Sequence, residues 1–122
     1  MYVKYAKNVH NIGKTTFDLE EEHGYVYMVD GKIIGCVKVD LWKTCIAIDT
    51  FEVLEKFRRK GWGTKMVKDL FLFYPNGSKI SGKSTEKAFD FWKTQENFEY
   101  LGEDYEEGTY YFKIDKTLKQ TA

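Results

Sequence analysis

The sequence contains little cysteine, little histidine and no excess charge of either sign. Two of its 122 residues are cysteine and two are histidine, while 19 lysines and arginines balance 19 aspartates and glutamates. His10 and His23 form no ligand-spaced cluster with a cysteine, so no metal site is expected. Because no net field surrounds the chain, neither nucleic acid nor an anionic membrane is an expected partner.

Long apolar runs are also lacking. No stretch approaches the roughly 18 consecutive apolar residues of a membrane-spanning helix. The start, Met1-Tyr2-Val3-Lys4-Tyr5, lacks the apolar core of a signal peptide. A cytoplasmic protein with reduced thiols is therefore expected. A cross-strand disulfide is the alternative, because Cys36 and Cys45 fall on strands that we expect to be neighbours.

The chain does contain ample material for a folded core. Hydrophobic residues make up 43% of it and aromatic residues 17%. This length suits one small domain, spanning residues 1–122, and is too short for two cores. No repeat, low-complexity segment or interdomain linker interrupts it.

The first half reads as strands. Residues 2–5 are expected to form an edge strand, and residues 6–22 a loop or short helix. An Asp30-Gly31 pair between two strand-like runs, residues 25–29 and 32–39, predicts a β-hairpin. A second reversal near Leu41-Trp42 leads to a third strand over residues 44–53. Its alternation weakens at residues 49–52, where a bulge or splay is expected.

The second half alternates helices and strands. A helical stripe predicts a helix over residues 62–73, ended by Pro75-Asn76-Gly77. A short strand at residues 79–81 then implies a crossover onto the sheet. Ser84 is the expected N-cap of a second helix, and Asn97 its left-handed end. Residues 98–101 and 109–115 read as two final strands. The expected fold is α/β (α+β), a mixed, mostly antiparallel sheet with flanking helices.

The segment between the third strand and the first helix carries the strongest functional signal. It reads Val53-Leu-Glu-Lys-Phe-Arg-Arg-Lys-Gly-Trp-Gly-Thr64 and contains Arg58-x-x-Gly61-x-Gly63. Glycines let a ligand approach the backbone, and the first amides of a helix have no partner inside it. Arg58, Arg59 and Lys60 add positive charge. The pattern predicts a seat for a pyrophosphate.

Two common glycine motifs do not fit this segment. A P-loop needs Gly-Lys-Ser/Thr after four intervening residues, and a dinucleotide fingerprint needs three glycines. The segment instead resembles the acetyl-coenzyme-A signature of the GNAT superfamily of N-acetyltransferases, Arg/Gln-x-x-Gly-x-Gly/Ala. In that family a valine-like residue commonly ends the preceding strand five positions earlier, as Val53 does here. The resemblance extends over roughly residues 24–115 and implies the GNAT fold.

By this resemblance the cofactor is acetyl-CoA and the reaction is acetyl transfer to an amine on a small molecule or a protein. The pyrophosphate would lie on the backbone of residues 58–63, beside Thr64. The Val53 amide would donate to the thioester carbonyl. The cofactor-binding residues are then Val53, Arg58, Arg59, Lys60, Gly61, Trp62, Gly63 and Thr64. The candidate bases are Asp49 and Glu52, with Asp49 preferred because the family often places an acid four residues before the valine.

The chain departs from the family in two places. Few residues are available between the first two strands, so the acceptor region must be abbreviated. Where the family often has a tyrosine that protonates the leaving thiolate, this chain has Trp92, and an indole cannot act as an acid. Four other tyrosines are remote candidates: Tyr100, Tyr105, Tyr110 and Tyr111.

These departures leave three hypotheses open. The first is an acetyltransferase that acts by direct attack, without an acyl-enzyme. The second is a non-catalytic CoA-binding or protein-interaction module on the same fold. The third, nucleic-acid binding through the basic cluster around Trp62, is less favoured. The tyrosine-rich final strand could also pair across a homodimer.

Overall fold

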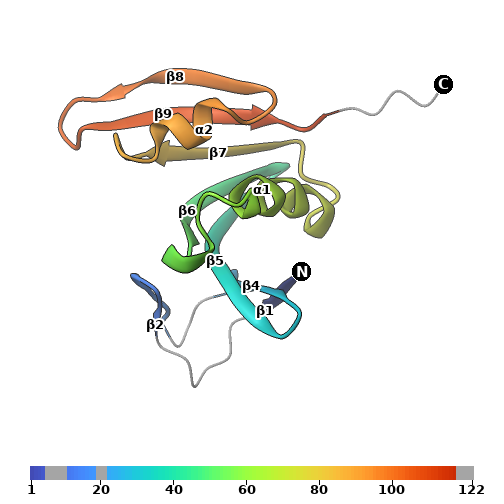
Figure 1. Ribbon diagram of the computed structural model, residues 1–122. Helices are drawn as coiled ribbons and strands as arrows, with labels where there is room; N and C mark the ends of the chain where they lie inside the picture. Colours follow the sequence, from blue (N-terminus) through green and yellow to red (C-terminus); the bar gives the residue numbers. More distant parts are fainter. Residues whose placement is uncertain (5–10, 19–21, 118–122) are drawn as a thin grey trace. The chain divides into compact units, whose positions relative to one another are not determined.

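The computed structural model describes residues 1–4, 11–18 and 22–117 (Figure 1). The chain has a mixed α+β architecture with a mostly antiparallel sheet. It divides into two compact units: Met1–Asp40 with Ile48–Pro75 (unit 1), and Leu41–Ala47 with Asn76–Ala122 (unit 2). No helix among the described residues is both long and apolar enough to cross a membrane.

The sheet of unit 1 follows the strand order β1-β4-β5-β6. Its strands are β1 (Tyr2–Lys4), β4 (Gly24–Val29), most of β5 (Lys32–Trp42) and the end of β6 (Cys45–Val53). Asp30 and Gly31, both at positive φ, form the tight turn between β4 and β5. These observations confirm the predicted hairpin, and β1 pairs with β4 as the predicted edge strand.

One face of this sheet packs against helix α1 (Trp62–Phe73), whose bounds match the prediction. Met66, Val67 and Leu70 form its buried stripe. Two tyrosines from neighbouring strands donate hydrogen bonds to this helix. Tyr2 Oη donates to the Met66 carbonyl oxygen at 2.7 Å, and Tyr27 Oη donates to Asp69 Oδ2. The helix is therefore tied to the sheet by hydrogen bonds as well as by apolar contact.

A small hairpin, β2 (Asn11–Ile12) and β3 (Thr15–Thr16), contributes to an apolar cluster of unit 1. Its anchors Ile12 and Phe17 pack with Val26 and Cys36, and Leu54 joins this cluster. The expectation of a loop or short helix is therefore wrong for residues 11–16. The rest of residues 6–22 lies outside the described residues, apart from 17, 18 and 22.

Unit 2 combines parallel and antiparallel pairing. The start of β6 runs parallel to β7 (Lys79–Ser84) through three pairs, Cys45↔Lys79 to Ala47↔Ser81, which confirms the crossover. β9 (Thr109–Asp115) then pairs antiparallel with β7 and with β8 (Phe98–Asp104). The short helix α2 (Phe89–Lys93) carries the buried Trp92, whose ring stacks on Phe112 at a centroid distance of 4.5 Å.

Three local predictions were wrong, the third only in part. The second reversal does not lie at Leu41-Trp42, which continue β5, but at Lys43-Thr44, where Lys43 has φ of 55°. Ser84 is not an N-cap: it ends β7, and its Oγ donates to the Thr85 carbonyl oxygen. Thr85 Oγ1 accepts the Ala88 amide at 3.2 Å in the turn before α2. Ala88 is the N-cap of α2, and no described side chain caps this helix. Asn97 has the predicted left-handed conformation, with φ of 64°, but it does not end the helix, because α2 ends at Lys93.

Both cysteines are free, and we expect them to differ in reactivity. Cys36 has no exposed surface, and burial raises the pKa of its thiol from 9.0 to about 11. Such a shift lowers the thiolate fraction about 100-fold. At pH 8, iodoacetamide should therefore modify Cys45 alone in the folded protein and both thiols in urea. Peptide mass mapping tests this prediction, and equal labelling of Cys36 under native conditions would contradict its burial.

Candidate active site

The end of β6 turns the peptide group of Val53 away from β5. The Leu54 amide donates to the Ile34 carbonyl oxygen on β5 at 2.8 Å. A Cβ added to Gly35 on β5 would overlap the Glu52 carbonyl oxygen, so that carbonyl also faces β5. In a strand, the N–H and C=O groups of successive residues point to opposite sides, so the N–H and C=O groups of Val53 point away from β5. Its carbonyl oxygen there accepts a hydrogen bond from Arg58 Nε at 2.8 Å.

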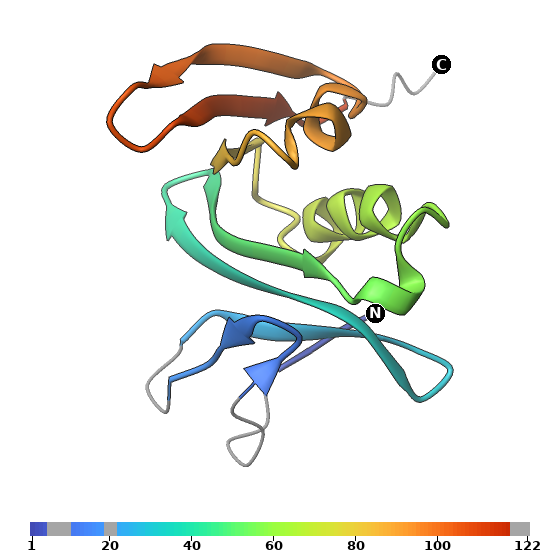
Figure 2. The same cartoon turned by 60° about the vertical axis from the view of Figure 1, so that its left-hand side comes forward.

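A tight turn carries the chain from this strand end into α1 (Figure 2). A single 3₁₀ turn, η1 (Glu55–Phe57), is followed by Arg59 and Gly61 at φ of 62° and 83°. Gly61 is the N-cap of α1, and its carbonyl oxygen accepts the Lys65 amide at 3.2 Å. Apart from the glycine itself and its two chain neighbours, no described atom lies within 4 Å of a Cβ placed on Gly61. The space beside Gly61 is therefore open.

The helix start offers donors and positive charge together. The amides of Trp62 and Gly63 belong to the first turn, where a helix supplies no internal acceptor. That turn, which the structure describes in full, contains no acidic residue. The side chains of Arg59 and Lys60 are exposed beside it, and Thr64 is half-buried. Residues 59–64 thus lie together at the helix start, where backbone donors and positive charge are of the kind that suits an anion.

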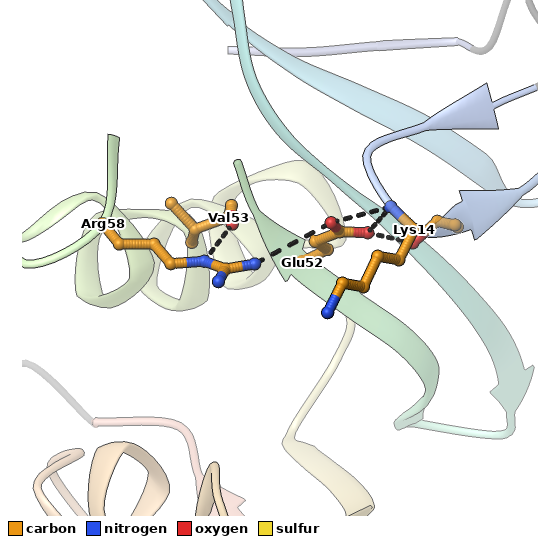
Figure 3. A network of polar contacts seen from close by, with 5 residues as sticks. Lys14, Glu52, Val53 and Arg58 are labelled. Carbon is orange, nitrogen blue, oxygen red and sulfur yellow. Dashed lines mark hydrogen bonds and ion pairs between the residues drawn. The ribbon is translucent and has the colours of Figure 1, made fainter. Parts of the chain in front are cut away.

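The side chain of Arg58 contacts the end of β6. Its guanidinium folds back along the strand end, with Nε bonded to the Val53 carbonyl oxygen and Nη2 3.9 Å from Glu52 Oε2. Its side chain remains 47% exposed. The arginine therefore braces the strand end while its backbone stays in the turn (Figure 3).

The two candidate bases have different surroundings. Asp49 is 64% exposed, and its Oδ2 lies 4.0 Å from Lys38 Nζ. Glu52 is only 12% exposed. Both of its oxygens lie 3.0 Å from the Lys14 amide, and Oε1 accepts from Thr15 Oγ1 at 2.6 Å. Asp49 is therefore accessible to solvent, whereas Glu52 is engaged by the β2–β3 hairpin.

No candidate acid lies in unit 1. Trp92 is part of the aromatic core of unit 2, and all four remote tyrosines belong to that unit as well. A hydrogen bond to Asp104 raises the pKa of Tyr111 above its ordinary value, and desolvation raises that of Tyr110. Both phenols are thus weaker acids than a free tyrosine.

Comparison with protein families agrees with this arrangement. A family model described as the acetyltransferase (GNAT) family matches residues 4–80, which include β6, the turn and α1. The chain belongs to the GNAT family. Comparison with curated proteins finds no match by sequence.

Solved structures with the GNAT fold are similar to this chain. GCN5 from Tetrahymena is 15% identical, with a TM-score of 0.64 over 80% of this chain and 71% of that one. Ard1 from Thermoplasma volcanium is 20% identical, with a TM-score of 0.63 over 80% and 72%. A Bacillus subtilis acetyltransferase in complex with CoA is 14% identical, with a TM-score of 0.62 over 81% and 80%. At these identities the likeness concerns the fold.

Family membership makes this GNAT chain an acetyltransferase whose acetyl donor is acetyl-CoA. Its own residues fit that donor. The open space beside Gly61 and the first-turn amides suit a diphosphate, and the outward peptide of Val53 suits the amide-rich pantetheine arm. Sequence reasoning missed the contacts that the β2–β3 hairpin and Arg58 make with Glu52. The glycine in Ile12-Gly-Lys-Thr15 was a signal for a turn, but nothing local indicated its partner.

Proposed function

We propose that this GNAT chain transfers the acetyl group of acetyl-CoA directly to a primary amine on a small molecule or a protein. The observation that carries the proposal is the geometry of unit 1. There, a strand end with an outward-facing peptide, that of Val53, leads within one turn to the N-terminus of α1, with open space beside Gly61. Such a pairing suits a ligand with a carbonyl at one end and a diphosphate at the other.

The diphosphate would lie on the amides of Trp62 and Gly63, with Arg59 and Lys60 beside it. Each charge–dipole contact at a helix start contributes about 0.3–1 kcal/mol. Several donors and the basic side chains are therefore needed together. The backbone of Arg58 and the hydroxyl of Thr64 complete the proposed set.

The Val53 amide would donate to the thioester carbonyl. Negative charge develops on that oxygen as the amine attacks, and a donor fixed in advance stabilises it without reorganisation. Removal of one such donor typically costs about 3–4 kcal/mol of transition-state stabilisation. The bond from Arg58 to the Val53 carbonyl oxygen supports this role, because it holds the same residue's backbone in place.

Asp49 is the favoured base of the two carboxylates. An amine with a lysine-like pKa of about 10.4 is mostly protonated at pH 7, which costs about 4–5 kcal/mol of nucleophile unless a base removes the proton. Asp49 is 64% exposed, so water or an amine can reach it. Glu52, the second candidate, is engaged by hydrogen bonds.

Direct attack also agrees with the state of the thiols and of the leaving group. Cys36, the cysteine of unit 1, is buried with a raised pKa and is a poor nucleophile. A thiol with a pKa of about 8.5 can leave as the thiolate without a general acid. The absence of a tyrosine at position 92 is therefore compatible with turnover.

We expect acetylation of at least one simple amine. The purified chain would be incubated with acetyl-CoA and cadaverine, spermidine or a peptide with one lysine. Loss of thioester absorbance and the mass of the acetylated amine are the readouts. CoA binding is measured separately by calorimetry. CoA binding without turnover of any amine would favour the non-catalytic CoA-binding module. If CoA does not bind at all, the proposed acetyl-CoA site is refuted.

The cytoplasmic location, the homodimer and the lack of a nucleic-acid or membrane partner stay predictions from sequence. Sedimentation of the purified chain tests the homodimer. Binding of a labelled oligonucleotide at several salt concentrations tests the nucleic-acid alternative, because a basic surface binds nucleic acid with strong salt dependence. Displacement of the oligonucleotide by free CoA would count against that alternative.

A further inference from the structure

One carboxylate joins three segments of unit 1 that are far apart in the sequence. Glu52 Oε1 and Oε2 both lie 3.0 Å from the Lys14 amide in the turn of the β2–β3 hairpin. Oε1 also accepts from Thr15 Oγ1 at 2.6 Å, and Oε2 lies 3.9 Å from Arg58 Nη2. Figure 3 shows Glu52 between Lys14 and Arg58. The β2–β3 hairpin, the end of β6 and Arg58, the first residue of the glycine motif, thus meet at the side chain of Glu52.

The hairpin is shaped for this contact. Gly13 has φ of 59°, and a Cβ there would overlap Glu52 Oε2 and lie 2.9 Å from Leu54 Cδ2. Only glycine lets the turn approach the carboxylate this closely. Ile12 and Phe17 hold the base of the hairpin in the apolar cluster with Val26 and Cys36. Glu52 therefore fixes the tip of a hairpin that is already attached at its base.

The same hairpin borders the favoured base. Lys38 Nζ donates to the Thr16 carbonyl oxygen at 3.0 Å and lies 4.0 Å from Asp49 Oδ2. Asp49 and Glu52 thus both connect to the hairpin, Asp49 through Lys38 and Glu52 directly. An amine that approaches Asp49 meets a surface whose position depends on the hairpin.

Glu52 is poorly suited to accept a proton from substrate. It is 12% exposed, and its oxygens already receive an N–H and an O–H donor. The hairpin thus occupies the carboxylate, and little of the side chain is left for a substrate amine to reach.

We propose that Glu52 is a positioning residue, not the general base: it fixes the tip of the β2–β3 hairpin against the end of β6 and so shapes the amine-binding side of the site. Through Arg58, which bonds to the Val53 carbonyl oxygen, the same carboxylate also steadies the strand end. This assignment rests on the proposed acetyl transfer. It makes the hairpin, which replaces a longer acceptor region, a determinant of acceptor affinity.

Three substitutions test the assignment with the fastest amine among cadaverine, spermidine and the one-lysine peptide. Glu52→Gln retains a carbonyl acceptor for the hairpin but cannot act as a base, so kcat should fall less than about tenfold and the acidic limb of the pH profile should persist. Glu52→Ala removes the acceptor, so the KM for the amine should rise about tenfold or more. Thr15→Val should raise the same KM several-fold. Thr16→Val, on the same hairpin, is the matched control, because its hydroxyl makes no bond to Glu52.

Hydrogen exchange over residues 11–18 gives a readout that needs no turnover. Glu52→Ala should accelerate exchange of the Lys14 amide, whereas Glu52→Gln should leave it protected. Calorimetry with CoA on the unmodified chain reports separately on the donor seat, so failure of the proposed function is recognised on its own. The assignment would be overturned if Glu52→Gln slowed turnover by about two orders of magnitude or more and lost the acidic limb. Unchanged exchange in Glu52→Ala would overturn it as well.

Discussion

Asp49→Asn is expected to lower kcat by about 10²–10⁴-fold at pH 7, with little change in the KM for acetyl-CoA, because general-base catalysis contributes that much. The variant should also acquire a steeper pH dependence. Without a base only the free amine reacts, so its rate should rise about tenfold per pH unit below the amine pKa of about 10.4. Initial rates of thioester loss between pH 6 and 9 measure both effects.

Asp40→Asn is the matched control for this substitution. Asp40 is an exposed aspartate on β5 and is not among the hydrogen-bond or ion-pair partners of Asp49 or Glu52 in the described structure, so its replacement should leave kcat and KM unchanged. An Asp49→Asn enzyme within about threefold of the unmodified rate across this pH range would show that Asp49 is not the base. In that outcome, the pH profile of Glu52→Gln would decide whether the other carboxylate is.

Gly61→Asp is expected to raise the KM for acetyl-CoA about 10–100-fold over that of Gly61→Asn. The two side chains have nearly the same shape, and both tolerate the left-handed backbone that Gly61 adopts. They differ by one negative charge at the start of α1. A like charge about 5 Å from a diphosphate in a partly exposed site costs about 1–3 kcal/mol, less at high salt.

Although Gly61→Asp should bind acetyl-CoA more weakly than Gly61→Asn, its free energy of unfolding should not be lower. A carboxylate at a helix start interacts favourably with the helix dipole by about 0.3–1 kcal/mol, so Gly61→Asp should be at least as stable as Gly61→Asn. Calorimetry with CoA and thermal unfolding, both at low and high salt, separate the two effects. Equal CoA affinity in the two variants would place the diphosphate away from residue 61.

Local chemistry explains why much of unit 1 could be predicted from the sequence. Asp30-Gly31 favours a turn with two positive φ angles, which few other dipeptides adopt, and both residues have them. The helix over 62–73 has a regular apolar stripe, and Pro75-Asn76-Gly77 follows it, so both its start and its end were evident. In each case the information lies within a few residues of the element that it specifies.

The parts that sequence reasoning missed depend on distant partners. The β2–β3 hairpin is short, and its strands are held by Ile12 and Phe17 in a cluster with β4 and β5 and by Glu52 at its tip. None of these partners is near it in the chain. Ser84 was misassigned because a serine before Thr-Glu looks like a cap, whereas the ladder with β9 extends β7 through it.

In the candidate site, too, some features follow from local sequence and others do not. The turn and helix start at residues 59–64 follow from the spacing of glycine and basic residues. The roles of Arg58 and Glu52 do not, because side-chain direction decides them. Arg58 bonds to the Val53 carbonyl oxygen five residues earlier, and no spacing rule distinguishes that from an arginine turned toward the phosphates.

The close contact between Gly13 and Glu52 limits how this chain can diverge. A methyl group at position 13 has no room beside the full-length glutamate, whereas a shorter residue at position 52 would make room but leave the Lys14 amide without its acceptor. The left-handed backbone at position 13 also disfavours a residue with a Cβ whatever stands at position 52. A descendant that changes its amine preference by remodelling this hairpin should therefore keep Gly13 and vary the residues around it.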